Sequence, residues 1–542
     1  MKTKVKYKDY GDFPDMNTVR DIVVYGAERG GDKKQFKFEN LDGKKEVKTF
    51  NETYRDVIGM YMYFRKLGLT GKKIALLSEN SYYWIAIFYA VSMGNFIMIP
   101  MDSKLTDPEL VDIAVRSRCD AICYSPDYAS TAELMRANED VCITEYIPIA
   151  DFYDHVRDGY GELADSDGIP CPDEKIDPDA LAYIVYTSGT TGKSKGVMLS
   201  QANVATDSTA TLRAMTAGQT VSFLPFNHTF SWASSIIAGH LLSVYVYISK
   251  SIKHLQKDFS EQHPQHFTAV PLAVETVNKR IWATAKKNGR TAALLNGLKL
   301  SRFLMKFGID LRHRLFKEVI DSLGGNLEMI ICGGAHLDEK YERELYDMGI
   351  QVIVGYGITE CSPVVTCNRL NDFKFGSVGK ALECNEIKIK DPDADGIGEV
   401  CVRGTNVMLG YYDDPEATEE AFDGEWYKTG DYGYIDSDGF LFLKGRKKNL
   451  IVLSNGKNVS PEELEEKLKQ IDYVKEVLVY DEDDVITAEF YLEPDAENAD
   501  RLREDVNAVN RELPTYKRIG NIKTRSTEFP KTTTMKIKRQ YS

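Results

Sequence analysis

The sequence predicts an α/β fold with a large N-terminal part and a small C-terminal part, and three observations lead to this prediction. Before about residue 186, helical segments alternate with short apolar runs such as 73–77 and 121–124, a rhythm typical of a mostly parallel sheet covered by helices. From residue 379 to 444 the pattern changes to short alternating strands joined by turns, which predicts a small antiparallel barrel. The 542 residues also exceed what one hydrophobic core usually supports, so we expect more than one domain.

Two long uncharged stretches are predicted to be buried inside the protein. Residues 84–101 are numerous enough to raise the question of a transmembrane helix. Four residues interrupt this stretch, namely Ser92, Gly94, Asn95 and Pro100. The interruptions predict a helix that ends near Met93 and a short strand over 96–99. Proline and glycine interrupt the stretch 214–249 in the same way, so we expect it to form core and the wall of an apolar pocket.

The second half of the chain repeats the alternation of strands and helices. Residues 327–332 predict a strand that leads into a glycine turn, 338–347 a charged helix, and 350–354 the next strand. Ligands in such folds bind at the carboxyl ends of the parallel strands, where these glycine-rich turns fall. The last part, 448–542, is typical of a small α+β unit whose first helix follows the N-cap residue Ser460.

One segment, YTSGTTGKSKG at residues 186–196, has no explanation in packing. It follows the strand predicted over 181–185 and combines glycines, hydroxyl residues and two lysines. Glycines allow the backbone to approach a ligand, hydroxyls and N–H groups bind phosphate oxygens, and lysines neutralise them. The segment therefore predicts a polyphosphate site. Its spacing differs from that of the phosphate loop of kinases and GTPases, and a flexible linker would not require the lysines.

Composition narrows the class of protein further. The net charge of −14 argues against general affinity for nucleic acid, which depends on neutralising phosphates. A polyanionic ligand would therefore need positive charge concentrated at its own site. The nine cysteines include no CxxC pair, which favours free thiols in a reducing cytoplasm, and the N-terminus lacks the apolar region of a secretory signal.

Further motifs accompany the loop, in the order and at the intervals of a known family. They are GGA at 333–335, GYGITE at 355–360, GEVCVRG at 398–404, YKTGD at 427–431, GRKKN at 445–449 and PKTTTMKIKR at 530–539. Together they resemble the signatures of the adenylate-forming superfamily, which includes acyl-CoA synthetases, luciferases and the adenylation domains of peptide synthetases. The resemblance extends from about residue 50 to the C-terminus. It implies a large AMP-binding domain, 1–447, of α/β/α subdomains plus a small β-barrel, and a small mobile α+β domain, 448–542.

The resemblance implies a reaction in which a carboxylate and ATP form an acyl-adenylate and pyrophosphate, after which a thiol releases AMP. The positions that match the phosphate-binding site are Thr187, Ser188, Gly189, Thr190, Thr191, Gly192 and Lys195. Thr187 and Glu360 match the Mg²⁺ site. The adenine pocket and the turn beside it match Gly333, Gly334, Ala335, Gly355, Tyr356 and Thr359. Without the motif around it, Glu360 would be an ordinary exposed loop carboxylate.

The resemblance also implies roles for residues in the small domain and in the segment just before it. Asp431 would bind the ribose hydroxyls with Arg446 nearby, whereas an isolated Asp in a TGD triplet more often caps a turn. Lys536 would bridge the substrate carboxylate and the α-phosphate, although Met535 stands where the family usually has glycine. Lys448 aligns with the hinge of the small domain.

Two further positions concern the thiol and the acyl group. Gly456 belongs to a loop that would face the pantetheine tunnel of CoA. His228 matches the residue at the entrance of the acyl site, although a lone histidine on an apolar stretch is often a core residue. Trp232 and the uncharged residues after it are predicted to line an acyl tunnel, and no carboxylate occurs there to hold an amino group. This absence in the sequence argues against amino-acid activation.

These expectations point to an AMP-forming ligase of medium- to long-chain fatty acids that uses ATP, Mg²⁺ and CoA and resembles bacterial long-chain fatty acyl-CoA synthetases. Two alternatives stay open, a fatty acyl-AMP or acyl-carrier-protein ligase with a carrier thiol, and a non-catalytic acyl or nucleotide-binding protein. Segment 276–317 has eleven lysines and arginines and one acidic residue. This excess of positive charge has two interpretations: the segment contacts the anionic inner face of a membrane, or it is a solvated helix without a partner. The protein is expected to be cytoplasmic, and a homodimer stays open.

Overall fold

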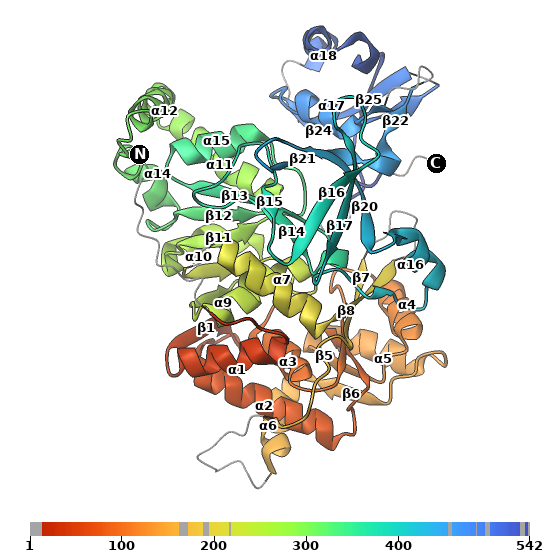
Figure 1. Cartoon of the computed structure of the whole chain (residues 1–542). Coiled ribbons are helices and arrows are strands. Elements are labelled where there is room, and N and C mark those ends of the chain that lie inside the picture. Colours follow the sequence, from red (N-terminus) through yellow and green to blue (C-terminus); the bar gives the residue numbers. More distant parts are fainter. Residues whose placement is uncertain are drawn as a thin grey trace. The chain divides into compact units, whose positions relative to one another are not determined.

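The computed structural model describes residues 13–161, 172–187, 194–215, 218–453, 458–483, 485–493, 499–531 and 537–539. The chain forms two compact units (Figure 1). Unit 1 contains Met1–Glu386 and Arg403–Glu425, and unit 2 contains Ile387–Val402 and Trp426–Ser542. The units therefore divide within the β-rich segment, and the domain boundary expected between residues 447 and 448 stays a prediction.

A nine-stranded sheet forms one half of unit 1. Its order is β15 (Lys380–Ala381), β14 (Val364–Cys367), β13 (Gln351–Gly357), β12 (Met329–Cys332), β11 (His266–Ala269), β9 (Thr220–Ser222), β10 (Val246–Ile248), β1 (Lys34–Glu39) and β2 (Lys45–Thr49). The strands from β13 to β1 are parallel, and antiparallel strands cover both edges. The alternation of strands and helices predicted from the sequence is confirmed here, with the helix after β12 beginning one residue later than predicted.

A seven-stranded sheet forms the other half of unit 1. Its order is β18 (Gly410–Tyr411), β8 (Lys195–Ser200), β7 (Leu181–Thr187), β4 (Ile97–Pro100), β3 (Lys73–Leu77), β5 (Ala121–Tyr124) and β6 (Glu145–Pro148). Strands β3 and β5 have the predicted bounds. The sheet is parallel from β7 to β6, whereas β8 and β18 run antiparallel to their neighbours.

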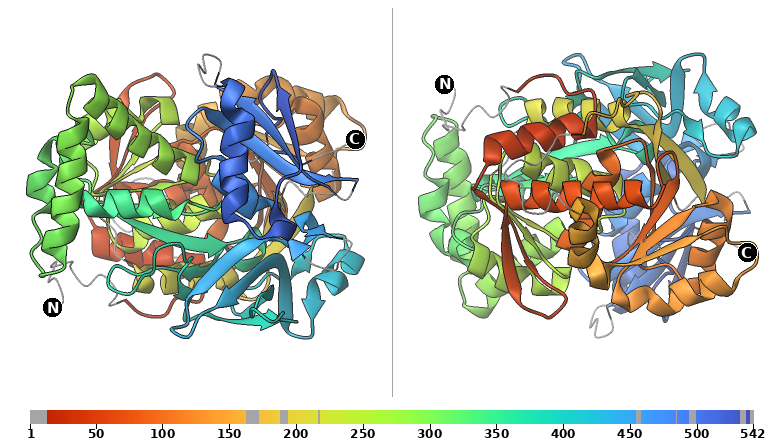
Figure 2. Two further views of the ribbon diagram at one scale, coloured as in Figure 1. Left: turned by 90° about the horizontal axis from the view of Figure 1, so that it is seen from above. Right: turned by 90° about the horizontal axis from the view of Figure 1, so that it is seen from below.

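The helices of unit 1 pack on these sheets or on one another (Figures 1 and 2). They are α1 (Val19–Gly30), α2 (Phe50–Lys66), α3 (Tyr82–Ser92), α4 (Asp107–Ser117), α5 (Ala129–Ala137), α6 (Phe152–Tyr160), α7 (Gln201–Ala214), α8 (Thr229–Ser231), α9 (Ala238–Leu241), α10 (Leu255–Gln262), α11 (Pro271–Lys287), α12 (Thr291–Met305), α13 (Arg312–Leu315), α14 (Lys317–Ser322), α15 (Glu339–Asp347) and α16 (Pro415–Ala421). The uncharged stretch 84–101 forms α3 and β4, as predicted, and every residue of α3 is buried. In the part of the chain that the structure describes, no helix has the length and apolar character needed to cross a bilayer.

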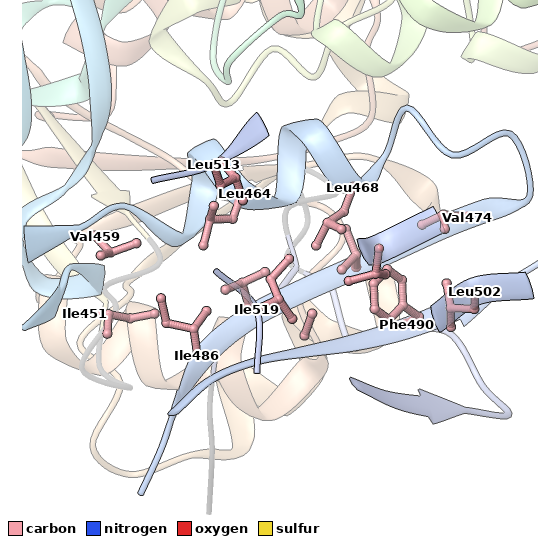
Figure 3. Packing of buried hydrophobic residues seen from close by; sticks show 14 residues of the cluster. Ile451, Val459, Leu464, Leu468, Val474, Ile486, Phe490, Leu502, Leu513 and Ile519 are labelled. Atoms are coloured by element: carbon pink, nitrogen blue, oxygen red, sulfur yellow. The ribbon is translucent and has the colours of Figure 1, made fainter. Parts of the chain in front are cut away.

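Unit 2 combines a sheet with a small α+β layer. Strands β16 (Asn385–Lys390), β17 (Gly398–Gly404), β20 (Trp426–Ile435) and β21 (Leu441–Arg446) belong to a five-stranded sheet, in which β20 is antiparallel to both β17 and β21. The α+β layer contains β22 (Ile451–Val452), β23 (Asn458–Val459), α17 (Pro461–Leu468), β24 (Val474–Glu482), β25 (Val485–Leu492), α18 (Leu502–Glu512) and β26 (Asn521–Arg525). Apolar side chains of α17, β24 and β25, among them Leu464 and Phe490, pack into its core (Figure 3). Ser460 caps α17 as predicted, because its hydroxyl accepts a hydrogen bond from Glu463 N–H.

Candidate active site

The ends of the predicted phosphate loop are held in place by neighbouring strands and by one arginine. Thr187 ends β7 and pairs with Lys195, the first residue of β8, across the antiparallel ladder. Arg116 of α4 donates hydrogen bonds to the carbonyl and the hydroxyl of Ser194 at 2.8 and 2.9 Å. Its guanidinium also lies 5.1 Å from the ring centroid of Tyr186. Both ends of the loop are therefore fixed to α4.

Five of the predicted phosphate-binding residues lie outside the described residues. They are Ser188, Gly189, Thr190, Thr191 and Gly192. Their neighbours Thr187 and Lys195 are half-buried and pair with each other at the ends of β7 and β8.

Tyr411 links the predicted metal ligand Glu360 to the predicted phosphate ligand Lys195. Glu360 lies in the helical turn η6 (Thr359–Cys361) that follows β13 and packs beside β8. The Tyr411 hydroxyl donates a hydrogen bond to Glu360 Oε1 at 3.0 Å, and Lys195 Nζ lies 4.7 Å from the centroid of the same ring. Sequence reasoning missed Tyr411. The glycine-tyrosine pair after GEVCVRG was the available signal, but its place beside Lys195 depends on the pairing of β18 with β8.

The backbone around Glu360 is clamped by a buried polar network. Met408 N–H donates to the Glu360 carbonyl at 2.9 Å. Asn406 Nδ2 lies 3.0 Å from the carbonyl oxygen of Cys361 and 3.2 Å from Oδ1 of Asp207, a fully buried residue of α7. Burial raises the pKa of Asp207 well above its usual value. Helix α7 therefore positions the segment that holds the Glu360 carboxylate.

The two predicted glycine turns lie next to each other at the carboxyl ends of β12 and β13. A Cβ atom on Gly333 would stand 3.1 Å from the Phe230 ring and 3.5 Å from the carbonyl oxygen of Gly355. The next residue, Gly334, has a φ of +85°, which side-chain-bearing residues rarely adopt. Only glycine therefore leaves a flat backbone surface at this place, as a planar base requires. Phe230 was not predicted from the sequence.

Three other predicted residues lie around these turns. Ala335 follows Gly334 directly, Tyr356 is buried within β13, and Thr359 opens the turn that carries Glu360.

His228 and Trp232 have different surroundings. His228 is half-buried and precedes α8, two residues before Phe230. Trp232 begins a π-helical turn and is 1% exposed, and its indole N–H donates to the Phe226 carbonyl at 2.5 Å. The ring of Phe88 lies 5.1 Å from that of Trp232, centroid to centroid. Trp232 is thus a member of a packed aromatic core, and its predicted place on a tunnel wall stays a prediction.

In unit 2, Asp431 and Arg446 form an ion pair. They face each other across β20 and β21, with 2.8 Å between Arg446 Nε and Asp431 Oδ1. Asp431 N–H donates to the Thr429 hydroxyl, and Arg446 Nη1 donates to the Thr429 carbonyl, both at 3.0 Å. The two residues expected at the ribose are therefore neighbours, and Arg446 fixes the direction of the Asp431 carboxylate.

Lys448 lies in the short helical turn η7 (Lys447–Asn449) that follows β21. Its pKa is lowered, first by burial and then by the positive charges of Arg446 and Arg539. The adjacent Asn449 donates from Nδ2 to Glu462 Oε1 at 2.7 Å, which ties the turn to α17. Gly456 lies outside the described residues.

The segment that carries Lys536 and Met535 also lies outside the described residues, but its flanks are fixed. Lys531 and Ile537 form an antiparallel bridge, and Lys538 N–H donates to the Pro530 carbonyl at 2.8 Å. Arg539 pairs with Glu465 of α17 at 2.5 Å. The residues on both sides of the predicted catalytic lysine are therefore attached to unit 2.

Comparisons with known proteins identify the family of this chain. The family model described as AMP-binding enzyme matches residues 25–412, and the model described as AMP-binding enzyme C-terminal domain matches residues 448–542. A long-chain-fatty-acid–CoA ligase of Mycobacterium bovis is 28% identical over 462 residues, which cover 79% of this chain and 74% of that protein. A chloroplastic long-chain-fatty-acid–[acyl-carrier-protein] ligase of Arabidopsis thaliana is 26% identical over 553 residues, covering 86% of this chain and 75% of that protein.

A solved structure shows the same fold. The anthranilate CoA ligase in complex with anthranoyl-AMP superposes with a TM-score of 0.77 at 22% identity. The superposition covers 98% of this chain and 97% of that chain. The predicted α/β architecture, with a large N-terminal and a small C-terminal domain, is therefore confirmed.

Proposed function

The chain belongs to the family of AMP-binding enzymes and is an adenylate-forming ligase, and from this premise we propose the reaction that it catalyses. It activates the carboxyl group of a medium- to long-chain fatty acid with ATP. A carboxylate oxygen attacks the α-phosphorus, the bond to the β-phosphate breaks, and an acyl-adenylate and pyrophosphate form. The thiol of CoA, as thiolate, then attacks the acyl carbon, which gives acyl-CoA and AMP.

The observation that carries this proposal is the link from Lys195 through Tyr411 to Glu360, beside the end of the predicted phosphate loop. The barrier to the first step is mostly electrostatic, because a carboxylate must approach a polyphosphate that is itself anionic. Lys195 supplies positive charge on one side of the Tyr411 ring. The Tyr411 hydroxyl orients the Glu360 carboxylate, which would bind a cation. Positioning of charge is therefore the main task of these residues.

A hard divalent cation fits the donor set of this site. Glu360 supplies a carboxylate whose direction is fixed by Tyr411, and Thr187 supplies a hydroxyl oxygen at the end of β7. Oxygen ligands of this kind suit Mg²⁺, which keeps part of its water and shares phosphate oxygens with few protein ligands. When bound, Mg²⁺ would neutralise the phosphates of ATP.

The nucleotide contacts in unit 2 belong to the same proposal. Asp431, oriented by Arg446, accepts hydrogen bonds from the ribose hydroxyls. Lys536 stabilises the negative charge that develops between the acyl carboxylate and the α-phosphate. Lys448 is the point about which the backbone rotates between the two half-reactions.

The names of the relatives support a fatty acid as the substrate, and they leave two thiol acceptors. CoA is the acceptor of the mycobacterial relative, and a carrier protein that of the Arabidopsis relative. We propose CoA as the acceptor. We also propose that the enzyme acts in the cytoplasm, at the inner face of a membrane, where long acyl chains partition. A non-catalytic binding protein is the alternative of another class.

Release of pyrophosphate separates these functions. The purified protein is supplied with ATP, Mg²⁺ and fatty acids of increasing chain length, with CoA, with a carrier protein or with neither. CoA-dependent turnover supports the proposal, carrier-dependent turnover supports the alternative acceptor, and no pyrophosphate with any acid indicates a binding protein. Glu360→Gln should abolish most turnover, whereas the matched surface change Glu419→Gln on α16 should not.

A further inference from the structure

The helical segment α11–α13 exposes an unusual number of large apolar side chains. Of the twelve large hydrophobic residues that are exposed in the described part of the chain, seven lie between residues 295 and 315. They are Leu295, Leu300, Phe303, Phe307, Ile309, Leu311 and Leu315. Phe303 and Phe307 are 58% and 61% exposed. A cluster of exposed apolar side chains of this kind marks a site where another protein or a membrane binds.

The apolar residues form a stripe along α12. Leu300 and Phe303, three residues apart, lie on one side of α12, and Phe307 follows in the turn after the helix ends at Met305. The rings of Phe303 and Phe307 lie 5.1 Å apart, centroid to centroid. The opposite side of α12 is buried through Leu294 and Leu298 and packs on α11 and α15. The apolar stripe therefore plays no part in holding α12 to unit 1.

A basic stripe runs directly beside the apolar stripe. Lys299, Arg302 and Lys306 have the same spacing, shifted by one residue, and all three are exposed. Arg302 forms an ion pair with Asp347. No carboxylate among the described residues forms an ion pair with Lys299 or Lys306. The α12 face, defined as these two stripes of three residues, thus combines exposed rings with uncompensated positive charge in a chain whose net charge is −14.

We propose that the α12 face is a docking surface for an anionic lipid bilayer. Amphipathic helices with this pattern lie in the interface, where aromatic and aliphatic side chains enter the acyl boundary and lysines contact the headgroups. Each lysine near an anionic membrane surface strengthens binding by about fivefold at moderate salt. The inference rests on the membrane location proposed above and names the surface that would provide it. Binding to a bilayer needs neither ATP nor acyl substrate, so it can be tested apart from the proposed reaction.

Charge favours lipid over the other occupants of such a surface. In a symmetric dimer through the α12 face, the basic stripes of the two copies would approach each other, and like charges oppose that contact. Figures 1 and 2 show α12 (green) at the margin of unit 1, with its outer side turned away from both sheets. A flat membrane can reach a helix in such a position without displacing the sheets of unit 1.

Co-sedimentation with vesicles tests the proposal without ATP or substrate. The wild-type protein should bind vesicles of phosphatidylcholine with about one third phosphatidylserine, bind pure phosphatidylcholine at least tenfold more weakly, and dissociate as salt is added. The double variants Lys299→Glu/Lys306→Glu and Phe303→Ser/Phe307→Ser should each lose at least tenfold in binding. Matched changes at exposed residues outside the face, Lys34→Glu/Lys44→Glu and Leu41→Ser/Leu134→Ser, should bind as the wild type does.

Further measurements keep the test decisive if a double variant folds poorly. Phe303→Trp should shift its fluorescence to shorter wavelength with anionic vesicles and not with neutral ones, and the reaction with detergent-dispersed fatty acid should be unchanged. Equal binding to neutral and anionic vesicles, or equal losses in the control variants, would overturn the proposal. A wild-type dimer that becomes monomeric in Phe303→Ser/Phe307→Ser would show instead that the face joins two copies of the chain.

Discussion

Tyr411→Phe is the substitution that examines the candidate site most directly. It removes the hydroxyl that donates to Glu360 Oε1 at 3.0 Å and leaves the ring on which Lys195 lies at 4.7 Å. A hydrogen bond to a charged group contributes about 1.5–3 kcal/mol. If about half of this acts on the geometry of the reaction, roughly 0.75–1.5 kcal/mol, adenylation falls by about 4- to 13-fold, because about 1.4 kcal/mol corresponds to a factor of ten. The loss should be larger at low Mg²⁺, since the Glu360 carboxylate is no longer oriented.

The assay is the initial rate of pyrophosphate release as a function of Mg²⁺ concentration. Tyr412→Phe is the matched control, because it removes a neighbouring hydroxyl that accepts a hydrogen bond from Lys73 Nζ at 2.8 Å, away from Glu360. Tyr411→Leu, which also removes the aromatic ring, should be slower than Tyr411→Phe. If Tyr411→Phe and Tyr412→Phe have equal rates and equal Mg²⁺ dependence, the link between Lys195 and Glu360 has no catalytic role.

Three further predictions concern the small domain and the buried histidines. Lys536→Ala should lower acyl-adenylate formation by roughly 100-fold, the scale for losing one charge-stabilising donor, while thioester formation from supplied acyl-adenylate continues; equal losses in both half-reactions would contradict the assignment. Lys448→Pro fixes φ near about −65° and should stop turnover, whereas Lys448→Ala should be mild, and a fully active proline variant would place the hinge elsewhere. Burial lowers the pKa of His240 and of His266 to about 4, so the unfolded state binds more protons between about pH 6.5 and 4 and stability falls as the pH drops through this window, by about 3 kcal/mol for each histidine. Urea unfolding of His266→Asn across this range should show a flatter pH dependence than the wild type, and an unchanged slope would contradict the buried neutral state.

Much of the fold was predictable because its signals are local. Strands β3 and β5 were predicted to the residue, since each is a short apolar run between polar segments. The helix and strand of 84–101 followed from the residues that interrupt the apolar stretch. The division between the units was not predictable, because it depends on the pairing of β17 with β20, a later strand that is separated from it by other elements.

The candidate site was predictable where a motif carries its own chemistry and not where a contact joins distant segments. Glu360 and Gly333 were predicted because their motifs resemble a known family, and their roles stay predictions. Tyr411 reaches Glu360 across a separation of 51 residues, and Asn406 reaches Asp207 across 199. Their roles arise from the register of β18 on β8 and from the packing of α7, which a pattern of residue types does not encode.

The hold of Arg116 on Tyr186 and Ser194 has a consequence for nucleotide affinity. A chain segment with fixed ends has fewer conformations to lose when it closes around a ligand, and the remaining cost grows only with the logarithm of its length. Part of the conformational entropy is therefore already lost when unit 1 folds, and this part does not reduce the free energy of ATP binding. Affinity for ATP and the folding free energy of α4 are therefore linked. A substitution that loosens α4, such as one at Asp112, which pairs with Arg116 at 2.7 Å, should weaken nucleotide binding from a position that never contacts the nucleotide.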